Sequence, residues 1–444
     1  MAVGLAHEMR RRGMSVSCCV IGPNLLQASI LRRLTGRWVR TIDERLLTPG
    51  QNVLSVYWAG IGADVVLILG RGGLYDGNPP GSWKGSDAEV ASLTRTPAVL
   101  VIDGGGWGSS LAALVKGFGD LARGFEIAGA LFTRVGEDGS AGQRERDAVS
   151  QTLEAYSLPR ELGVLSTFSA PAQIPEGAAA QSRSSTLLPV QFFTEAGAAI
   201  ARSVNIEGLM ERAAHVASVR INDFEYKPVT RRCRIAVSDD SCFNLCFQDN
   251  LDLLRYFGAE IVTFSPLADS GLPKKVGAVY ITGGYLAEYG PELAANQSMK
   301  RALREFAGSG GVVYSEGSGS AYLCSRFNCT SECGEIEGVG LIPAVASFKG
   351  LTPLAYRDLT TVEESVLGRT GLACRGIVSE NWELIQQDHN LPRVFRVTQS
   401  GCAAQAEGCS PGAQVVAMTG YNHFGSCPSM ARNLVEAAEV VARI

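Results

Sequence analysis

The 444-residue sequence contains only four histidines and no Cys-x-x-Cys pair, although it has twelve cysteines. Zinc sites are usually built from histidines and closely spaced cysteine pairs, so no metal site is predicted. No apolar run approaches the roughly 20 residues that a membrane-spanning helix needs, and the N-terminus lacks the apolar core of a secretory signal. We therefore expect reduced, mostly buried thiols in a soluble protein, cytoplasmic by default, or organellar if the N-terminus is incomplete.

An excess of charge of either sign is also lacking. Lys and Arg number 40 against 44 Asp and Glu, for a net charge of -4. This balance argues against nucleic acid or an anionic membrane surface as a partner. Hydrophobic residues make up 46% and charged residues 19% of the chain, a composition that fills cores. At this length we expect two domains.

Short apolar runs alternate with helical patterns in the first half of the chain. Three runs are continuous and rich in Val, Ile and Leu, which predicts parallel strands buried on both faces: residues 65–69, 98–102 and 127–132. Helical patterns lie near 86–95, 108–123 and 142–156. This alternation predicts a doubly wound α/β domain.

A second α/β series follows. Residues 171–187 are poor in large apolar side chains and predict a surface loop or linker at about 171–190. A helical stretch at 191–218 leads into five further apolar runs, at 235–237, 260–264, 278–281, 312–314 and 414–417. We therefore predict two doubly wound domains, comprising residues 1–229 and 230–444.

The most informative segment is the turn Glu316-Gly317-Ser318-Gly319, which follows the apolar run 311–314. A sharp strand-to-helix turn projects one side chain into a site and needs small neighbours. This turn resembles the Glu-Cys-Gly-Gly elbow of the cobyrinic acid a,c-diamide synthase family, which amidates tetrapyrrole carboxylates with glutamine nitrogen. In that register Gly317 stands at the position of the nucleophilic cysteine.

The resemblance runs through nearly the whole chain. Five segments of the first half look like the family's ATP-binding domain: Ile21–Asn24, Thr35–Arg37, Gly73–Gly77, Ser86–Ala91 and Leu114–Phe118. Four segments of the second half look like its glutaminase domain: Asp249–Leu251, Phe264–Leu267, Gly283–Tyr285 and Glu292–Asn296. The resemblance implies a dethiobiotin synthetase-like P-loop domain followed by a flavodoxin-like glutamine amidotransferase domain, in a degenerate member of the family.

The family's reaction, by implication, uses Mg-ATP to phosphorylate a corrinoid carboxylate, and ammonia released from glutamine then displaces the phosphate. The nucleotide site of such a domain begins with a strand and a glycine-rich loop ending in Gly-Lys-Thr. Here Met1 falls just past that motif. Because the missing strand would lie inside the sheet, its neighbours would keep unpaired backbone groups. We expect an upstream segment to fill this gap, or else a partner or a rearrangement.

Other positions that match the family's ATP and magnesium site carry different residues here. Asn24 stands where the family has an aspartate, and Leu69 where it has a glutamate. Magnesium prefers carboxylate oxygens, so these changes weaken a metal site. Asp76 and Asp103 remain as candidates near a phosphate-bound ion, although aspartates at strand ends often only cap or form turns. The run Gly104–Gly108 is interpreted as a flexible turn.

The glutaminase half lacks its catalytic pair. A cysteine nucleophile needs a histidine base, and the resemblance places Tyr421 at that base position. Tyrosine, with a free pKa of about 10, is a poor base at neutral pH. His423 matches a second histidine of the family, and the backbone amides of Gly283 and Gly284 match its oxyanion hole.

Two substrate-facing segments have changed too. A family segment rich in Gly-His-Glu-Phe-His reads Gly376-Ile377-Val378-Ser379-Glu380 here, and one around Pro-Glu-Arg-His reads Pro175-Glu176-Gly177-Ala178. Losing these histidines and an arginine removes groups that would hold tetrapyrrole carboxylates.

Three functional hypotheses follow. The first is a pseudoenzyme without glutaminase activity that binds a ligand, such as a tetrapyrrole, or a protein partner. The second is an active tetrapyrrole amidoligase whose P-loop lies upstream of Met1. The third is a hydrolase with Ser318 or Ser320 as nucleophile and His423 as base, since alternate residues of a strand point the same way.

Overall fold

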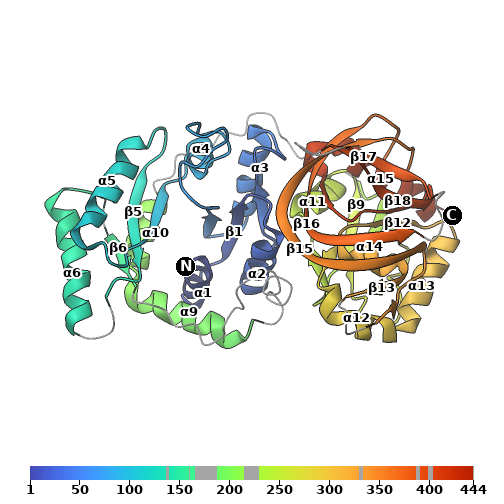
Figure 1. Ribbon diagram of the computed structural model, residues 1–444, viewed down its shortest axis with the longest axis horizontal. Helices are drawn as coiled ribbons and strands as arrows, with labels where there is room; N and C mark the ends of the chain where they lie inside the picture. Colours follow the sequence, from blue (N-terminus) through green and yellow to red (C-terminus); the bar gives the residue numbers. More distant parts are fainter. Residues whose placement is uncertain are drawn as a thin grey trace. The chain divides into compact units, whose positions relative to one another are not determined.

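The computed structural model describes residues 1–136, 140–159, 161–165, 188–214, 230–329, 334–386, 391–398 and 404–443. They form two compact units, one from the described residues before 215 and one from those after 229 (Figure 1). Most of the predicted linker, and the residues just before the predicted boundary at 230, lie outside the described residues. Both therefore stay predictions.

Unit 1 contains two separate three-stranded sheets. The first has the order β2 (Arg40–Ile42), β1 (Val16–Ile21), β3 (Val65–Leu69), and the second has the order β4 (Ala98–Asp103), β5 (Ile127–Thr133), β6 (Glu161–Val164). All neighbouring strands within both sheets are parallel. Figure 1 draws β1 in blue and β5 in cyan, in separate groups of strands. The three apolar runs predicted as strands are confirmed, but their predicted burial is correct only for β5: in β3 only Val65 is buried, and Val101 of β4 is 54% exposed.

The helices of unit 1 begin and end where local chemistry requires. They are α1 (Ala2–Arg11), α2 (Leu25–Thr35), α3 (Pro49–Gly60), α4 (Asp87–Thr94), α5 (Leu111–Leu121), α6 (Ser140–Ala155), α9 (Val190–Ser203) and α10 (Ile206–Ala213). Helix α3 starts with a reciprocal capping box between Thr48 and Gln51. Helix α2 ends at Gly36, whose φ of 70° suits the left-handed cap that glycine adopts readily.

One apolar core lies between strands of both sheets and helices α1, α9 and α10. It includes Ala6 and Phe193 from the helices and Val20 and Leu131 from the strands, all buried. The helix predicted over 191–218 is present as α9 and α10, which the residues Val204 and Asn205 separate, and its last residues, 215–218, lie outside the described residues. The shared core shows that the two sheets belong to one unit.

Unit 2 is built on a twelve-stranded mixed sheet. Its parallel part has the order β9 (Ala259–Phe264), β7 (Cys233–Ser238), β10 (Ala278–Ile281), β12 (Val312–Ser315), β19 (Val415–Ala417). The predicted strands of the second series are all present there. A long antiparallel pair, β15 (Ile342–Thr361) and β16 (Ala373–Gln386), extends the sheet and was not predicted. It departs from a doubly wound pattern because its strands pair with each other without an intervening helix.

Unit 2 has seven further named strands and five α-helices among its described residues. The strands are β8 (Phe243–Leu245), β11 (Gly283–Gly284), β13 (Cys324–Asn328), β14 (Ile336–Glu337), β17 (Arg393–Thr398), β18 (Gln405–Gly412) and β20 (Tyr421–His423). The helices are α11 (Gln248–Tyr256), α12 (Leu286–Ala295), α13 (Gln297–Gly308), α14 (Ser318–Leu323) and α15 (Pro428–Ala442). Aromatic side chains, among them Tyr280, Tyr314 and Tyr322, are fully buried in its core.

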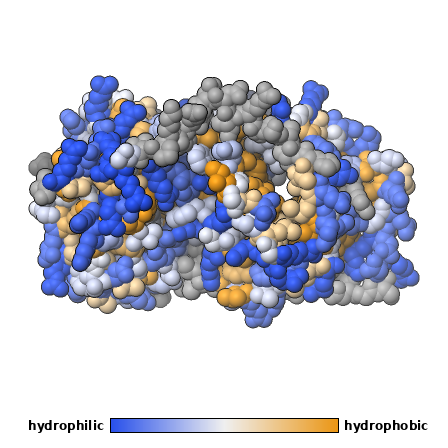
Figure 2. All heavy atoms as spheres, turned by 180° about the vertical axis from the view of Figure 1, so that it is seen from behind, coloured by the Kyte–Doolittle hydropathy of each residue, from blue (hydrophilic) through white to orange (hydrophobic). Residues whose placement is uncertain are grey.

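The described cysteines, helices and surface agree with what the composition predicts. Each of the ten described cysteines is buried and outside any disulfide. In the described part of the chain, no helix is both long enough and apolar enough to cross a membrane. The face shown in Figure 2 is mostly hydrophilic, with apolar residues scattered among polar ones.

A glycine sets the approach of α1 to α9. A Cβ on Gly4 would lie 2.6 Å from the carbonyl oxygen of Ala196 and 2.7 Å from Cγ1 of Ile200. We expect Gly4→Ala to lower the free energy of unfolding by about 1–3 kcal/mol, because the two helices must move apart. Urea unfolding measures this loss.

The matched control is Gly117→Ala on the exposed face of α5, where an added Cβ meets nothing within 4 Å. This change should stabilise the protein by roughly 0.5–1 kcal/mol. Equal stability of Gly4→Ala and the native protein would show that α1 and α9 are not in close contact.

Candidate functional site

The predicted elbow is present as a strand-turn-helix unit in the core of unit 2. Strand β12 ends at Ser315, and α14 begins at Ser318. Between them Gly317 has φ 55° and ψ -134°, a conformation that a residue with a Cβ rarely adopts. Its backbone N–H donates to the carbonyl of Gly420 at 3.2 Å, which ties the elbow to the segment before β20.

The side chain of Tyr421 fills the space in front of this elbow. A Cβ on Gly317 would lie 2.4 Å from the Tyr421 hydroxyl, and a Cβ on Gly283 would lie 2.0 Å from it. Both distances are far below ordinary van der Waals contact. The ring of Tyr421 therefore fits only because both facing residues are glycines. The tyrosine at the base position thus occupies the space that a side chain at the nucleophile position would need.

A buried carboxyl group holds Tyr421 in place. The Tyr421 hydroxyl donates to one oxygen of Glu380 at 2.8 Å, and the indole N–H of Trp382 donates to the other at 2.9 Å. Burial raises the pKa of Glu380 to about 7, against the lowering effect of these hydrogen bonds. Burial and the neighbouring Glu380 raise the pKa of Tyr421 well above its ordinary value. Tyr421 is thus a hydrogen-bond donor here and not a base.

A second buried carboxyl group lies directly before the elbow. Glu316 accepts hydrogen bonds from the hydroxyls of Tyr280 and Tyr314, each at 2.5 Å, and from the backbone N–H of Asn422 at 2.8 Å. Burial raises its pKa to about 7. These contacts join three strands, β10, β12 and β20, beneath the elbow.

The oxyanion-hole position is occupied by a serine of the chain itself. The backbone N–H of Gly284 donates to Ser318 Oγ at 2.7 Å, and Ser318 Oγ donates to the Gly284 carbonyl at 3.0 Å. Ser320 Oγ donates to the carbonyl of Met418 at 2.6 Å. The protons of both hydroxyls therefore go to carbonyl oxygens and not to a base.

His423 has a different set of neighbours. Its Nδ1 accepts from the N–H of Gly425 at 3.1 Å, and its ring packs on Phe247 with centroids 4.5 Å apart. Its Nε2 lies 3.8 Å from a carboxylate oxygen of Asp249. Since Ser318 gives its proton to Gly284, the structure does not pair Ser318 with His423 as nucleophile and base. The predicted hydrolase constellation is therefore not formed.

The candidate ATP and magnesium residues of unit 1 have local structural partners. The side-chain oxygen of Asn24 caps α2 by accepting from the N–H of Gln27 at 3.0 Å. Asp103 forms a bidentate pair with Arg134, whose hydrogen bonds lower the pKa of that carboxyl group. Leu69 is the last residue of β3.

Asp76 lies in a turn in which its N–H donates to the Gly73 carbonyl at 3.1 Å. The Gly104–Gly108 run also forms a turn, closed by a bond from the N–H of Trp107 to the carbonyl of Gly104 at 3.3 Å. Among the residues that the structure describes, no three His, Cys, Asp or Glu side chains gather in a way that could hold a metal ion.

Known proteins resemble this chain over most of its length. It is 30% identical over 387 residues to the cobyrinate a,c-diamide synthase of Streptococcus sanguinis, covering 85% of this chain and 82% of that protein. It is 28% identical to the enzyme of the same name from Dehalococcoides mccartyi, covering 98% and 94% of the two chains. The hydrogenobyrinate a,c-diamide synthase of Streptomyces coelicolor is 29% identical, with coverage of 85% and 82%. The family model of the CobB/CobQ-like glutamine amidotransferase domain matches residues 234–368.

This chain belongs to the cobyrinate a,c-diamide synthase family. The resemblance predicted from the sequence is confirmed, as is the α/β fold class with a glutamine amidotransferase-like second unit. Ile377, at one drifted family segment, is buried on β16 and lies opposite Tyr421 in the sheet. The other drifted segment, Pro175–Ala178, lies outside the described residues.

Sequence reasoning missed three buried residues of this family member's site. Glu316 and Glu380 were named as parts of motifs, but no role was predicted for their carboxyl groups. Asn250 donates to the carbonyl of Asn422 at 2.8 Å and accepts from the N–H of Phe424 at 2.7 Å, so it fixes β20. The only available signal was that these polar residues stand beside apolar runs.

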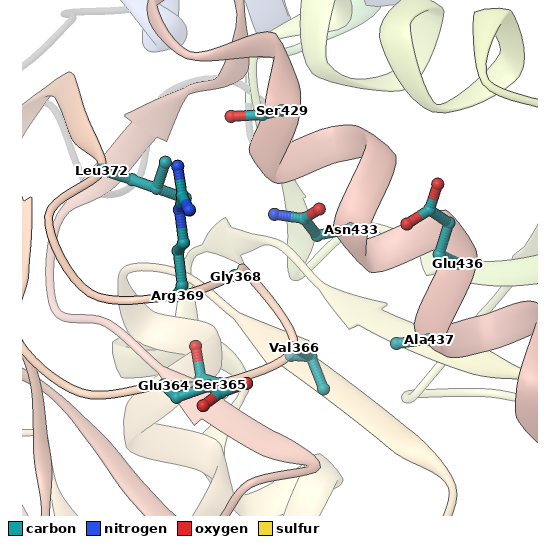
Figure 3. Close-up of a pocket in the computed structure, with 10 residues that line it drawn as sticks. All are labelled: Glu364, Ser365, Val366, Gly368, Arg369, Leu372, Ser429, Asn433, Glu436 and Ala437. Atoms are coloured by element: carbon teal, nitrogen blue, oxygen red, sulfur yellow. The ribbon is translucent and has the colours of Figure 1, made fainter.

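A surface pocket of unit 2 lies apart from all predicted site residues. Its volume is about 470 Å³, and it lies between the loop carrying Glu364 and Arg369 and the face of α15 carrying Asn433 and Glu436 (Figure 3). Its charged groups have mixed signs and its walls are partly apolar. None of the residues that line this pocket belongs to the elbow or to the other predicted site residues.

The buried carboxyl groups make stability depend on pH. The pKa of Glu380 is about 7 in the folded protein, above its ordinary value of 4.5, so between these values the folded state binds more protons. The free energy of unfolding should therefore fall as pH rises from 4.5 to 7 and then level off. In Glu380→Gln this fall should be smaller, which urea unfolding at several pH values measures.

Glu305→Gln serves as the control, because Glu305 is exposed on α13. Its pH profile should run parallel to that of the native protein. Identical profiles for Glu380→Gln and the native protein would mean that folding does not raise the pKa of Glu380. Glu288, which contributes through space to the raised pKa of Glu380, remains in both variants.

Proposed function

We propose that this chain is a member of the cobyrinate a,c-diamide synthase family that has no glutaminase activity and acts by binding a ligand or a protein partner. One observation carries the proposal: the Tyr421 hydroxyl lies where a side chain at Gly317 would have to be. Glutamine hydrolysis of the expected kind needs a nucleophile at that position. Glycine has none, and the space for the substrate amide is taken by the tyrosine ring.

The surrounding hydrogen bonds support the proposal that Tyr421 stays in front of the elbow. Tyr421 donates to Glu380, and the Gly284 amide that would hold an oxyanion is bonded to Ser318. Opening the site would leave a buried carboxyl group and a buried amide without these partners, at a cost of about 1–3 kcal/mol for each. A resting active site that waits for substrate would not be built this way.

The ligand side of the proposal is a tetrapyrrole or an apolar protein segment, in a protein that we place in the cytoplasm by default. Binding of Mg-ATP is not expected, because the Asn24 amide is engaged as a helix cap and Asp103 is paired with Arg134. Magnesium would have to displace that arginine to reach the carboxylate.

A second candidate is an amidoligase that uses free ammonia. The similarity to named synthases favours it, because the match covers 98% of the chain and so includes unit 1. Such an enzyme would not need the blocked elbow. It would need Mg-ATP, and this requirement separates the two candidates.

Purified full-length protein should release glutamate from glutamine at the background rate, because no thiolate can form at residue 317. The structural basis is tested by a double-mutant cycle with Gly317→Ala and Tyr421→Ala. We expect Gly317→Ala to cost about 2–4 kcal/mol in the native background, from overpacking and backbone strain. In the Tyr421→Ala background it should cost clearly less, because only the strain remains.

Gly310→Ala is the matched control for strain alone. Gly310 also has a positive φ of 87°, but a Cβ there meets nothing within 4 Å. Its cost should be the same with or without Tyr421. Additive effects of Gly317→Ala and Tyr421→Ala would falsify the blocked-elbow proposal, as would glutamine-dependent release of glutamate.

Calorimetric titration with Mg-ATP distinguishes the two candidate functions. For the binding protein we expect no saturable heat with nucleotide at about 1 mM, which corresponds to a binding free energy weaker than about -4 kcal/mol. Saturable, magnesium-dependent binding would instead favour the amidoligase. Circular dichroism of the same sample should confirm that the titrated protein is folded.

A further inference from the structure

The pocket between the β15–β16 loop and helix α15 is bounded by a loop of fixed shape. The hydroxyl of Thr361 donates to the carbonyl of Arg369 at 2.8 Å and accepts from the N–H of Leu372 at 2.8 Å. Ser365 and Gly368 exchange two backbone hydrogen bonds, of 3.0 and 2.8 Å. Because both the base and the tip of the loop are hydrogen-bonded, the pocket is formed without a ligand, as is usual for small-molecule sites.

Contacts with neighbouring segments hold this loop against α15. The side-chain amide of Asn433 donates to the carbonyl of Leu367 at 2.9 Å, and the N–H of Val366 donates to the carbonyl of Ala413 at 3.2 Å. A Cβ on Gly368 would lie 2.3 Å from Nδ2 of Asn433, so only glycine allows this close approach. The space left beside the contact, about 470 Å³, is near the small end of the range of about 300–1,000 Å³ for ligand pockets. It therefore suits a small molecule.

Charged side chains of opposite sign line this pocket without pairing with one another. Arg369 and Glu364 come from the loop, and Glu436 comes from α15. All three are exposed, and within the described part of the chain no hydrogen bond or ion pair engages their charged groups. A guanidinium and two carboxylates that leave one another free around a single space can each pair with a ligand. This combination favours a ligand that itself carries both signs of charge.

Donors and acceptors lie in different parts of the pocket. In Figure 3 the side chains of Arg369, Asn433 and Ser429 point into the same part of the space. Glu364 lies beside Ser365 at the other end of the loop. A carboxylate is thus met by a guanidinium, an amide and a hydroxyl in one part, and an ammonium group by a carboxylate in another.

We propose that this pocket binds a short peptide, of the size of a dipeptide with small apolar side chains. The peptide's carboxylate pairs with the guanidinium of Arg369, and its ammonium group pairs with the carboxylate of Glu364. Its side chains contact the apolar lining residues Val366, Leu372 and Ala437. A single amino acid would leave much of the space unfilled, and a polyanion would be repelled by the two carboxylates.

This inference goes beyond the function proposed above, because none of the lining residues belongs to the elbow. Glutaminase activity would leave the pocket as it is. Failure of peptide binding would leave the elbow blocked by Tyr421. The two proposals therefore fail separately.

Calorimetric titration of the full-length protein with alanylvaline tests the site. We expect saturable binding with a Kd of about 0.1 mM. Alanylvaline amide lacks the carboxylate and N-acetylalanylvaline lacks the ammonium group, so each should bind at least about tenfold more weakly, because each loses one charge-assisted hydrogen bond. Hydrogen exchange in the presence of alanylvaline should slow in residues 362–372 and in the first turns of α15.

Two variants assign each charge of the peptide to its partner. Arg369→Gln should weaken binding of alanylvaline at least about tenfold but leave binding of its amide unchanged. Glu364→Gln should weaken binding of alanylvaline by a similar factor but leave binding of the N-acetyl form unchanged. Arg301→Gln and Glu363→Gln are the matched controls, because both residues are exposed and neither lines the pocket. Both should bind all three compounds as the native protein does.

Four results would overturn the proposal. One is the absence of saturable heat with alanylvaline up to about 10 mM. Another is equal binding of alanylvaline and its two blocked forms, since the charged ends would then play no part. A third is slowing of hydrogen exchange only outside residues 362–372 and α15, because the peptide would then bind elsewhere. The last is tighter binding of the polyamine spermidine than of alanylvaline, since the excess of carboxylates alone would then select the ligand.

Discussion

The contact between the Tyr421 hydroxyl and the Glu380 carboxyl group is the interaction on which the second unit's site depends. It holds an aromatic ring against Gly283 and Gly317, and it leaves no room for a side chain at either position. Because glycine is required at both facing positions, the three residues form one interdependent arrangement. A cysteine substituted for Gly317 alone would therefore clash with the ring of Tyr421.

The same site contains two buried carboxyl groups, and their burial affects the stability of the fold. Each group of Glu316 and Glu380 accepts several hydrogen bonds, yet burial still raises the pKa of each to about 7. Buried polar groups with satisfied hydrogen bonds specify one arrangement of the core but add little net stability. The hydrogen bonds of these carboxyl groups thus make the elbow part of the packed core of unit 2.

The first unit presents the opposite situation, with apolar strands that are not fully covered. Helices α1, α9 and α10 share one apolar core with strands of both three-stranded sheets, so the unit is compact. Val101 of β4 is 54% exposed, and among the described strands β3 pairs only with β1 and β4 only with β5.

The sequence by itself determined the family, the parallel strands at 65–69 and 127–132, and the absence of a cysteine at Gly317. These follow from local composition, periodicity and motif order, which are properties of neighbouring residues. Tertiary structure alone decided that Tyr421 fills the elbow and that Ser318 bonds to Gly284 and not to His423. It also divided the first sheet in two and formed the long β15–β16 pair. Such contacts join residues far apart in the chain, and no local pattern encodes which distant side chain will occupy a given space.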